Sequence, residues 1–121
     1  MSDMAKITKN FSVEEMQCPC CDECDMDDEF MRNLQEIRTI CGFGFRVNSA
    51  YRCDIYNNKV SSNSKGQHTK GQAVDISIRD RYKRYAVLKE AIATGYFWDI
   101  AIAKTFIHLG KGNVKNGIGV Y

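Results

Sequence analysis

The spacing of apolar residues along the chain predicts two amphipathic helices. The first follows a capping aspartate, Asp25 or Asp27, and ends at Gly42. The second follows Asp80 and ends at Gly95. The expected apolar faces consist of Phe30, Leu34, Ile37 and Cys41 in the first helix and of Tyr85, Leu88 and Ile92 in the second.

Alternation of apolar and polar residues predicts the strands, because side chains along a strand point to opposite faces with a period of two. The expected strands are 45–49, 73–78, 98–102, 105–109 and 117–121. A hairpin around Ala103 and Lys104 joins the third and fourth of them. This order of elements is typical of an α+β domain in which the helices pack on one mainly antiparallel sheet.

The length and composition fit a single domain. The chain has 121 residues, of which 44% are hydrophobic and 26% are charged, as in ordinary globular domains. We expect residues 1–10 to form a loosely held N-terminal arm and residues 11–121 to fold as one domain, with loop over residues 11–24. No apolar run approaches the ~20 residues of a membrane span, and we expect no signal peptide because residues 1–10 lack an apolar core.

The charge pattern excludes two classes of partner. The net charge is +2, and the basic residues are scattered among acidic ones rather than gathered in a stripe. Such a pattern does not favour binding to nucleic acid. Together with the absence of a long apolar run, it gives no reason to expect a membrane as a partner.

A histidine and an aspartate lie seven positions apart in a setting that suits metal binding. His68 lies in a loop rich in serine, asparagine, lysine and glycine, and Asp75 lies at the start of the apolar strand that follows. Gly71 allows a tight backbone turn between them, and Ala73 keeps the strand entrance narrow. Loop and strand can therefore converge on one ion.

The second histidine of the chain provides a third candidate ligand. His108 lies in the expected strand 105–109, where the period of two puts it on the same face as Phe106. Taken alone, it would more often be a core histidine, and His68 would more often be an ordinary surface residue. With Asp75 they make a three-ligand site with a position left for water, which is the arrangement of a catalytic zinc.

Six cysteines make up a second group of candidate ligands. Four cluster in the sequence and two stand apart, namely Cys18, Cys20, Cys21 and Cys24 in the cluster, and Cys41 and Cys53 outside it. The spacing is C-x-x-C at 18/21 and at 21/24, and in a reducing compartment such clusters more often bind metal or stay as thiols than form disulfides. The cluster and Cys53 can hold a structural zinc, and the alternatives are free thiols or one disulfide that ties the two segments together.

Three motifs together resemble the zinc D-alanyl-D-alanine peptidases, a family that includes phage endolysins, van-type dipeptidases and the hedgehog signalling domain. They are H-x-x-G-x-A-x-D from His68 to Asp75, S-x-Y-R from Ser49 to Arg52, and F-I-H ending at His108. The segments Phe11-Ser12 through Cys18-Pro19-Cys20-Cys21 and Tyr51-Arg52-Cys53 are similar to the small phage and prophage members. The resemblance covers most of the chain and implies a hedgehog-like α+β fold with Zn²⁺ bound by His68, Asp75 and His108.

The resemblance also implies roles for residues beside the zinc. Arg52 would bind the scissile carbonyl and stabilise the oxyanion that develops during hydrolysis, a contribution often worth ~3 kcal/mol. Without that role, Arg52 would be a solvated cation in a polar turn. Ser49 would hold the substrate or the Arg52 side chain, and Tyr51 is expected to pack.

The chain departs from the family at the general base. Family members place a carboxylate six or three residues before the last histidine or two residues after it, and these positions are Ile102, Thr105 and Gly110 here. Zinc can activate water without such a base, but losing a positioned acid or base typically costs about 10² to 10⁴ in rate. Asp99 is the nearest acidic candidate in the sequence, and its alternative role is a structural charge at the start of a strand.

These features imply a zinc-dependent peptidase that hydrolyses an amide bond in peptidoglycan stem peptides, as an endolysin or a carboxypeptidase does. The alternative, supported by the missing carboxylate, is a weak or inactive peptidase fold that serves as a binding or virion-structural protein. A redox or metal-storage role for the cysteines would leave the two histidines unexplained. We expect the stem peptide and other phage particle proteins as partners. The protein would be made in the host cytoplasm and act at the bacterial cell wall, after release or within a phage particle.

Overall fold

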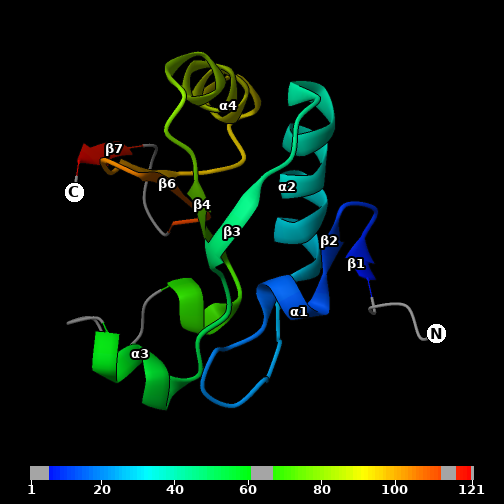
Figure 1. Cartoon of the computed structure of the whole chain (residues 1–121), viewed down its shortest axis with the longest axis vertical. Helices are drawn as coiled ribbons and strands as arrows, with labels where there is room; N and C mark the ends of the chain where they lie inside the picture. The colour runs from blue at the N-terminus through cyan, green and yellow to red at the C-terminus, as the bar shows by residue number, and fades with distance from the viewer. Residues whose placement is uncertain (1–5, 61–66, 113–116, 121) are drawn as a thin grey trace.

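A five-stranded sheet forms the centre of the molecule in the computed structural model, which describes residues 6–60, 67–112 and 117–120 (Figure 1). The strand order is β3-β4-β6-β5-β7. The bounds are Arg46–Ser49 for β3, Ala73–Ser77 for β4, Asp99–Ile102 for β5, Phe106–Gly110 for β6 and Gly117–Val120 for β7. All neighbouring pairs are antiparallel except β5 and β7, which are parallel. The predicted α+β class and the hairpin between β5 and β6 are therefore confirmed.

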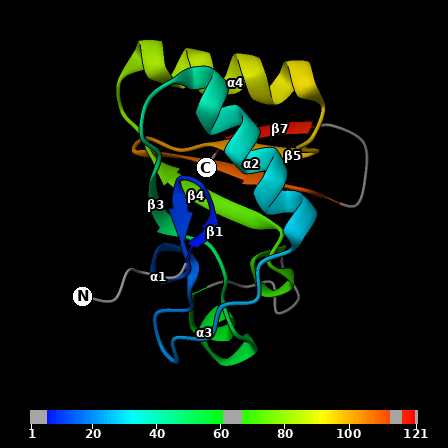
Figure 2. The ribbon, with the colours of Figure 1, turned by 90° about the vertical axis from the view of Figure 1, so that its right-hand side faces the viewer.

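Helix α2 (Asp28–Cys41) begins and ends where the sequence predicts. The Asp27 side chain accepts a hydrogen bond from the Phe30 N–H at 2.9 Å, and Gly42 adopts the left-handed conformation that ends the helix. Its buried face consists of Phe30, Met31, Leu34 and Ile37, with Cys41 partly buried. Figure 2 shows α2 crossing in front of the sheet, so this face closes one side of the core.

Helix α4 (Arg81–Thr94) has the predicted cap at Asp80 and the predicted end at Gly95. Of its predicted apolar face, Leu88 packs against the core, but the prediction is wrong for Tyr85 and Ile92. Tyr85 and Ile92 are 69% and 58% exposed, whereas Val87 and Ala91 are completely buried. The smaller side chains face inward, where α4 packs against α2. Arg84 also turns inward, and its guanidinium donates hydrogen bonds to the carbonyls of Ala103 and Phe106.

The N-terminal segment is more ordered than the sequence indicates. The structure has a small hairpin of β1 (Lys6–Thr8) and β2 (Phe11–Ser12), followed by the one-turn helix α1 (Val13–Met16). Ser12 and Glu15 form a reciprocal capping box at the start of α1. The expected arm therefore includes a strand at residues 6–8, while residues 1–5 lie outside the described part. The expected loop over residues 11–24 begins only after Met16.

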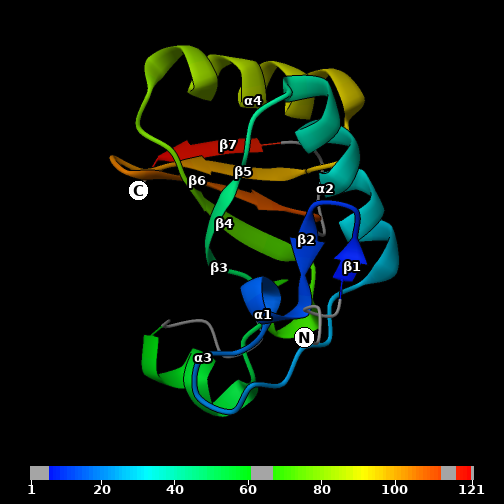
Figure 3. The same ribbon diagram turned by 45° about the vertical axis from the view of Figure 1, so that its right-hand side comes forward.

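One end of the molecule consists of short helices and loops and lies outside the sheet. Helix α3 (Asp54–Val60) lies there beside the loop that follows α1, as Figure 3 shows. The sequence predicts no helix at this position. The short 3-10 helix η1 (Gln67–Lys70) leads from this end into β4. Of the predicted polar loop at residues 61–71, residues 61–66 lie outside the described part.

Gly71 connects η1 to β4 at the point where the start of α2 comes closest. Its φ is +67°, and its carbonyl accepts a hydrogen bond from the Asp27 N–H at 2.9 Å. A Cβ at this position would overlap the Asp25 carbonyl oxygen and would lie 2.7 Å from Met26 Cα. Gly71 therefore allows both the turn and the close approach of α2.

Among the described residues, no helix combines the length and the apolar character that a membrane crossing requires.

We expect Gly71→Ala to lower the free energy of unfolding by about 2 kcal/mol or more, because it combines a strained φ with a clash against backbone atoms. Gly95→Ala is the matched control, since Gly95 has a φ of +68° and nothing within 4 Å of an added Cβ. It should cost only about 1 kcal/mol. Urea unfolding of both variants measures the difference, and equal losses would show that the contact with residues 25–27 imposes no constraint.

Candidate metal centre

The side chains of His68, Asp75 and His108 converge on one point. His108 Nδ1 lies 2.8 Å from Asp75 Oδ1, and His68 Nε2 lies 3.6 Å from the same oxygen. The candidate donor atoms of all three residues lie within 4.8 Å of one another, and all three side chains are buried. The structure thus brings together the three residues that the sequence indicates as metal ligands.

Strand register places two of these ligands and Ser49 in a row. Asp75 in β4 pairs with Ser49 in β3 on one side and with His108 in β6 on the other. Directly paired residues in neighbouring strands have side chains on the same face, close enough to interact. The register between β4 and β6 therefore puts Asp75 and His108 side by side on one face of the sheet.

His68 reaches the site from η1, and a backbone contact fixes its ring. His68 Nδ1 lies 2.6 Å from the carbonyl oxygen of Ala50, so the ring donates a hydrogen bond from Nδ1 and leaves Nε2 as the acceptor atom facing Asp75. Metal-binding histidines commonly have their second nitrogen held in this way, which selects the tautomer and the ring orientation.

Asp75 carries a negative charge in a buried position. Burial alone would raise the pKa of this carboxyl group, but its hydrogen bond with His108 and the nearby imidazole of His68 outweigh that effect and hold the pKa well below its usual range. The guanidinium of Arg52 adds a positive charge, with Nη2 at 3.6 Å from Asp75 Oδ2. Asp75 is therefore an ionised acceptor, as a metal ligand must be.

Three hydrogen bonds hold Arg52 beside the candidate metal ligands. Its Nε donates a hydrogen bond to Ser49 Oγ at 3.0 Å, and its Nη1 donates to Asn57 Oδ1 at 3.5 Å. The Arg52 N–H also donates to the carbonyl of His68 at 3.2 Å. The guanidinium is thus aimed at the ligands, and Ser49 holds the arginine. Tyr51 packs against the core, as expected.

Two residues with amide side chains contact the site although no sequence pattern indicates them. Asn57 is buried in α3 and contacts Arg52, as described above. Gln67, next to His68, donates a hydrogen bond from Nε2 to Asp99 Oδ2 at 2.8 Å. Its Oε1 is buried and has no hydrogen-bond partner among the described residues. The sequence offers only their positions as a signal, since Gln67 directly precedes His68 and Asn57 lies five residues after Arg52.

Asp99 contacts the site from the start of β5. Its Oδ2 lies 3.5 Å from His108 Nε2, on the other side of the imidazole from Asp75. The side chain is 47% exposed, so it faces solvent as well as the histidine. The structure therefore places Asp99 in contact with the candidate ligand His108, through the ring nitrogen that faces away from Asp75.

Positions 102, 105 and 110, where the resembling family carries its general-base carboxylate, lie in different places around the three candidate ligands. A Cβ at Gly110 would lie 3.0 Å from His108 Nε2, so position 110 is next to the His108 ring, and this Cβ would overlap Gln67 Oε1. The Gln67 side chain thus occupies the space that a residue at 110 would need. Thr105 lies in the turn between β5 and β6, where its carbonyl accepts a hydrogen bond from the Ile78 N–H. Ile102 is in β5 opposite Ile107.

The donor set fits zinc. Two imidazole nitrogens and one carboxylate oxygen are ligands that zinc accepts, and three protein ligands leave a fourth position free for water or substrate. His68 Nε2, Asp75 Oδ1 and His108 Nδ1 are the atoms that face one another and would hold the ion. The second ring nitrogen of each histidine also has a partner. His108 Nε2 faces Asp99 and His68 Nδ1 contacts the Ala50 carbonyl, as is typical of histidines that bind a metal.

Three of the cysteines in the sequence cluster lie together with Cys53, at some distance along the chain from the histidine site. The thiols of Cys18, Cys20, Cys21 and Cys53 lie within 4.8 Å of one another. Cys24 is not part of this group, although its C-x-x-C spacing from Cys21 predicts it. It packs instead against the hydrophobic core, as Cys41 does. All six cysteines are free of disulfides.

Comparison with known proteins agrees with this geometry. The sequence profile of the family described as Peptidase M15 matches residues 9–110, which include the three candidate ligands and Arg52. Peptidases of this family are typically zinc-dependent, as the two imidazoles and the carboxylate would require. No curated protein sequence matches the chain.

We expect Asp75→Ala to remove about one zinc ion per chain and to lower the melting temperature, because metal binding free energy contributes to folding. Metal analysis of the dialysed protein measures the first effect, and thermal unfolding measures the second. Asp28→Ala is the control, since Asp28 is an exposed acid in the first turn of α2. Equal zinc content in the wild-type protein and Asp75→Ala would exclude this residue as a ligand.

Proposed function

The chain belongs to the Peptidase M15 family, and we propose that it is a zinc-dependent peptidase that hydrolyses an amide bond in peptidoglycan stem peptides. The grouping of His68, Asp75 and His108 beside the Arg52 guanidinium carries this proposal. The peptidoglycan substrate is supported by the S-x-Y-R and H-x-x-G-x-A-x-D motifs, which resemble those of the D-alanyl-D-alanine peptidases. The similarity to small phage members supports a site of action at the bacterial cell wall, with other phage particle proteins as partners.

Each residue of the site has a chemical role in this reaction. His68, Asp75 and His108 would hold the zinc ion, which would supply a Lewis acid able to activate water near neutral pH. Arg52 binds the scissile carbonyl oxygen and stabilises the negative charge that develops on it. Ser49 and Asn57 hold the guanidinium in place, so the charge is oriented before the substrate arrives. The Arg52 side chain is 16% exposed and is therefore within reach of a substrate.

Asp99 acts on the reaction through His108. The two nitrogens of this imidazole face opposite ways, with Nδ1 at 2.8 Å from Asp75 and Nε2 at 3.5 Å from Asp99. A carboxylate on the far side of a ligating histidine fixes the ring and raises its basicity. We therefore assign Asp99 as a positioning residue rather than as the general base.

A binding or virion-structural role is the second candidate function. The observation that favours it is the lack of a carboxylate at positions 102, 105 and 110, where the resembling families carry their base. As a peptidase, the protein should then hydrolyse its substrate slowly, because a positioned acid or base is worth about 10² to 10⁴ in rate. Hydrolysis of purified peptidoglycan, followed by mass spectrometry of the released peptides, separates the two functions.

We expect measurable release of stem-peptide fragments from the unmodified protein and a loss of about two orders of magnitude in Arg52→Ala, with zinc content unchanged. Arg52→Lys should recover only part of the rate, because an ammonium group cannot make the forked contacts of a guanidinium. Arg46→Ala, which removes an exposed arginine from β3, is the control. Absence of hydrolysis on every peptidoglycan type, with zinc bound, would favour the binding module.

A separate comparison of Asp99→Ala with Asp99→Asn tests the positioning role. We expect Asp99→Ala to weaken zinc binding by about 10 to 100-fold and Asp99→Asn to restore most of it, since an amide oxygen can still accept a hydrogen bond from His108. Zinc affinity measured by competition with a chelator gives both values. If Asp99→Asn instead kept its affinity and lost about 10² or more in rate, Asp99 would be the general base.

A further inference from the structure

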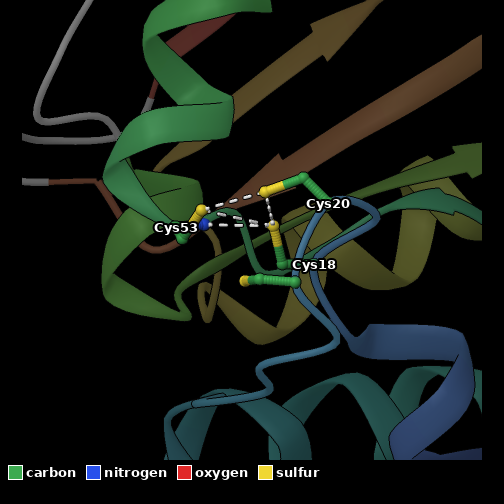
Figure 4. Close-up of side chains that lie close together, drawn as sticks. Cys18, Cys20 and Cys53 are labelled. Atoms are coloured by element: carbon green, nitrogen blue, oxygen red, sulfur yellow. Dashed lines mark hydrogen bonds between the residues drawn. The ribbon is translucent and has the colours of Figure 1, made fainter.

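Four cysteine thiols from two distant segments meet beside the turn that carries Arg52. Cys18 Sγ lies 3.6 Å from the sulfurs of both Cys20 and Cys53, and the sulfurs of Cys20 and Cys53 are 3.3 Å apart (Figure 4). The sulfur of Cys21 lies within 4.8 Å of these three. Cys18 is completely buried, Cys53 is partly buried, and the other two are exposed.

The distances between the sulfur atoms suit ligands of one zinc ion and are too long for a disulfide. Bonded sulfur atoms lie about 2.05 Å apart, well below any of the separations in this group. Four sulfurs around a zinc ion at about 2.3 Å would lie roughly 3.8 Å from one another. The 3.3 to 3.6 Å between the three measured pairs are close to that value, and no single pair stands out as a bonding partner.

The backbone around the thiols is arranged to accept sulfur with a negative charge. The N–H of Cys53 donates a hydrogen bond to Cys18 Sγ at 3.4 Å, and the N–H of Tyr56 donates to Cys53 Sγ at 3.4 Å. Hydrogen bonds to a charged acceptor stabilise that charged form. The two least exposed thiols of the group thus have the partners that metal-bound thiolates require.

The loop with three of the four cysteines is closed by its own hydrogen bonds. The Cys18 N–H donates to the carbonyl of Glu23 at 2.7 Å, and the Asp22 N–H donates to the carbonyl of Cys18 at 3.0 Å. Asp22 has a φ of +61°, which turns the chain back on itself. This turn holds Cys20 and Cys21 on the same side as Cys18, while Cys24 leaves the loop toward the core.

We propose that Cys18, Cys20, Cys21 and Cys53 bind a second zinc ion with a structural role. Four thiolates fill a tetrahedral coordination shell and leave no position for water, so this site has no part in hydrolysis. Its effect is to join the N-terminal loop to the start of α3. Cys53 directly follows Arg52, so the second zinc also fixes the backbone from which the catalytic guanidinium extends.

Zinc content of single variants tests the proposed set of ligands. The unmodified protein should carry roughly two zinc ions per chain, and Cys20→Ser and Cys53→Ser should each carry roughly one. Cys24→Ser is the matched control, because the C-x-x-C spacing from Cys21 includes Cys24 and the geometry excludes it. Cys24→Ser should keep both ions. Loss of zinc in Cys24→Ser but not in Cys20→Ser would overturn the assignment.

Asp75→Ala separates this site from the histidine site, since it should lose one zinc and keep the sulfur-bound one. Failure of the peptidase proposal would leave this result unchanged. The combination of Asp75→Ala with Cys53→Ser should bind no zinc.

X-ray absorption at the zinc edge can be measured on the unmodified protein, so the result does not depend on whether a variant folds. We expect two kinds of scatterer in equal parts, one set of sulfur atoms at about 2.3 Å and one set of nitrogen and oxygen atoms at about 2.0 to 2.2 Å. In Asp75→Ala the spectrum should reduce to sulfur alone. A spectrum without sulfur, or an intact mass lower by two hydrogens with Cys18 linked to Cys53 in the peptide map, would contradict the proposal.

Discussion

The buried carboxylate of Asp75 is the group on which the arrangement of the site depends. A charge in the interior is costly unless it has partners, and removal of one partner from a buried pair is strongly destabilising. Asp75 has His68, His108 and Arg52 around it, each from a different segment of the chain. The need to match this charge ties η1, β6 and the turn after β3 to the centre of the sheet.

The turn from Ser49 to Cys53 links this centre to the rest of the molecule. Arg52 contacts Asp75 through its side chain and His68 through its N–H, and Cys53 contacts Cys18. One short segment therefore joins the metal ligands, the N-terminal loop and α3. In the proposed function it also presents the guanidinium to the substrate, so its rigidity determines how well the developing charge is matched.

The parts of the fold that follow local rules could be predicted from the sequence. Asp27 and Gly42, and likewise Asp80 and Gly95, mark helix ends because capping depends on a few neighbouring residues. The face of α4 could not be predicted, since Val87 and Ala91 fit helical spacing as well as Leu88 and Ile92 do. The choice between these two faces is made by packing against α2.

The site could be predicted in part for the same reason. The motif spacing and the predicted strands indicated Asp75 and His108 as candidate ligands, and the register of β4 with β6 brings them together. Helix α3 has no apolar stripe, and its buried residue is the polar Asn57, so no hydrophobic pattern indicates the helix or its contact with Arg52. Sequence spacing grouped Cys24 with the other cysteines, whereas the turn at Asp22 separates it from them.

The claim that His68, Asp75 and His108 hold the catalytic metal is tested most directly by anomalous diffraction from crystals at the zinc absorption edge. The arrangement of the side chains predicts a strong peak bonded to His68 Nε2, to a carboxylate oxygen of Asp75 and to His108 Nδ1, at about 2.0 to 2.2 Å from each. A map with no peak among these three residues, or with the His68 and His108 rings turned away from each other, would contradict it.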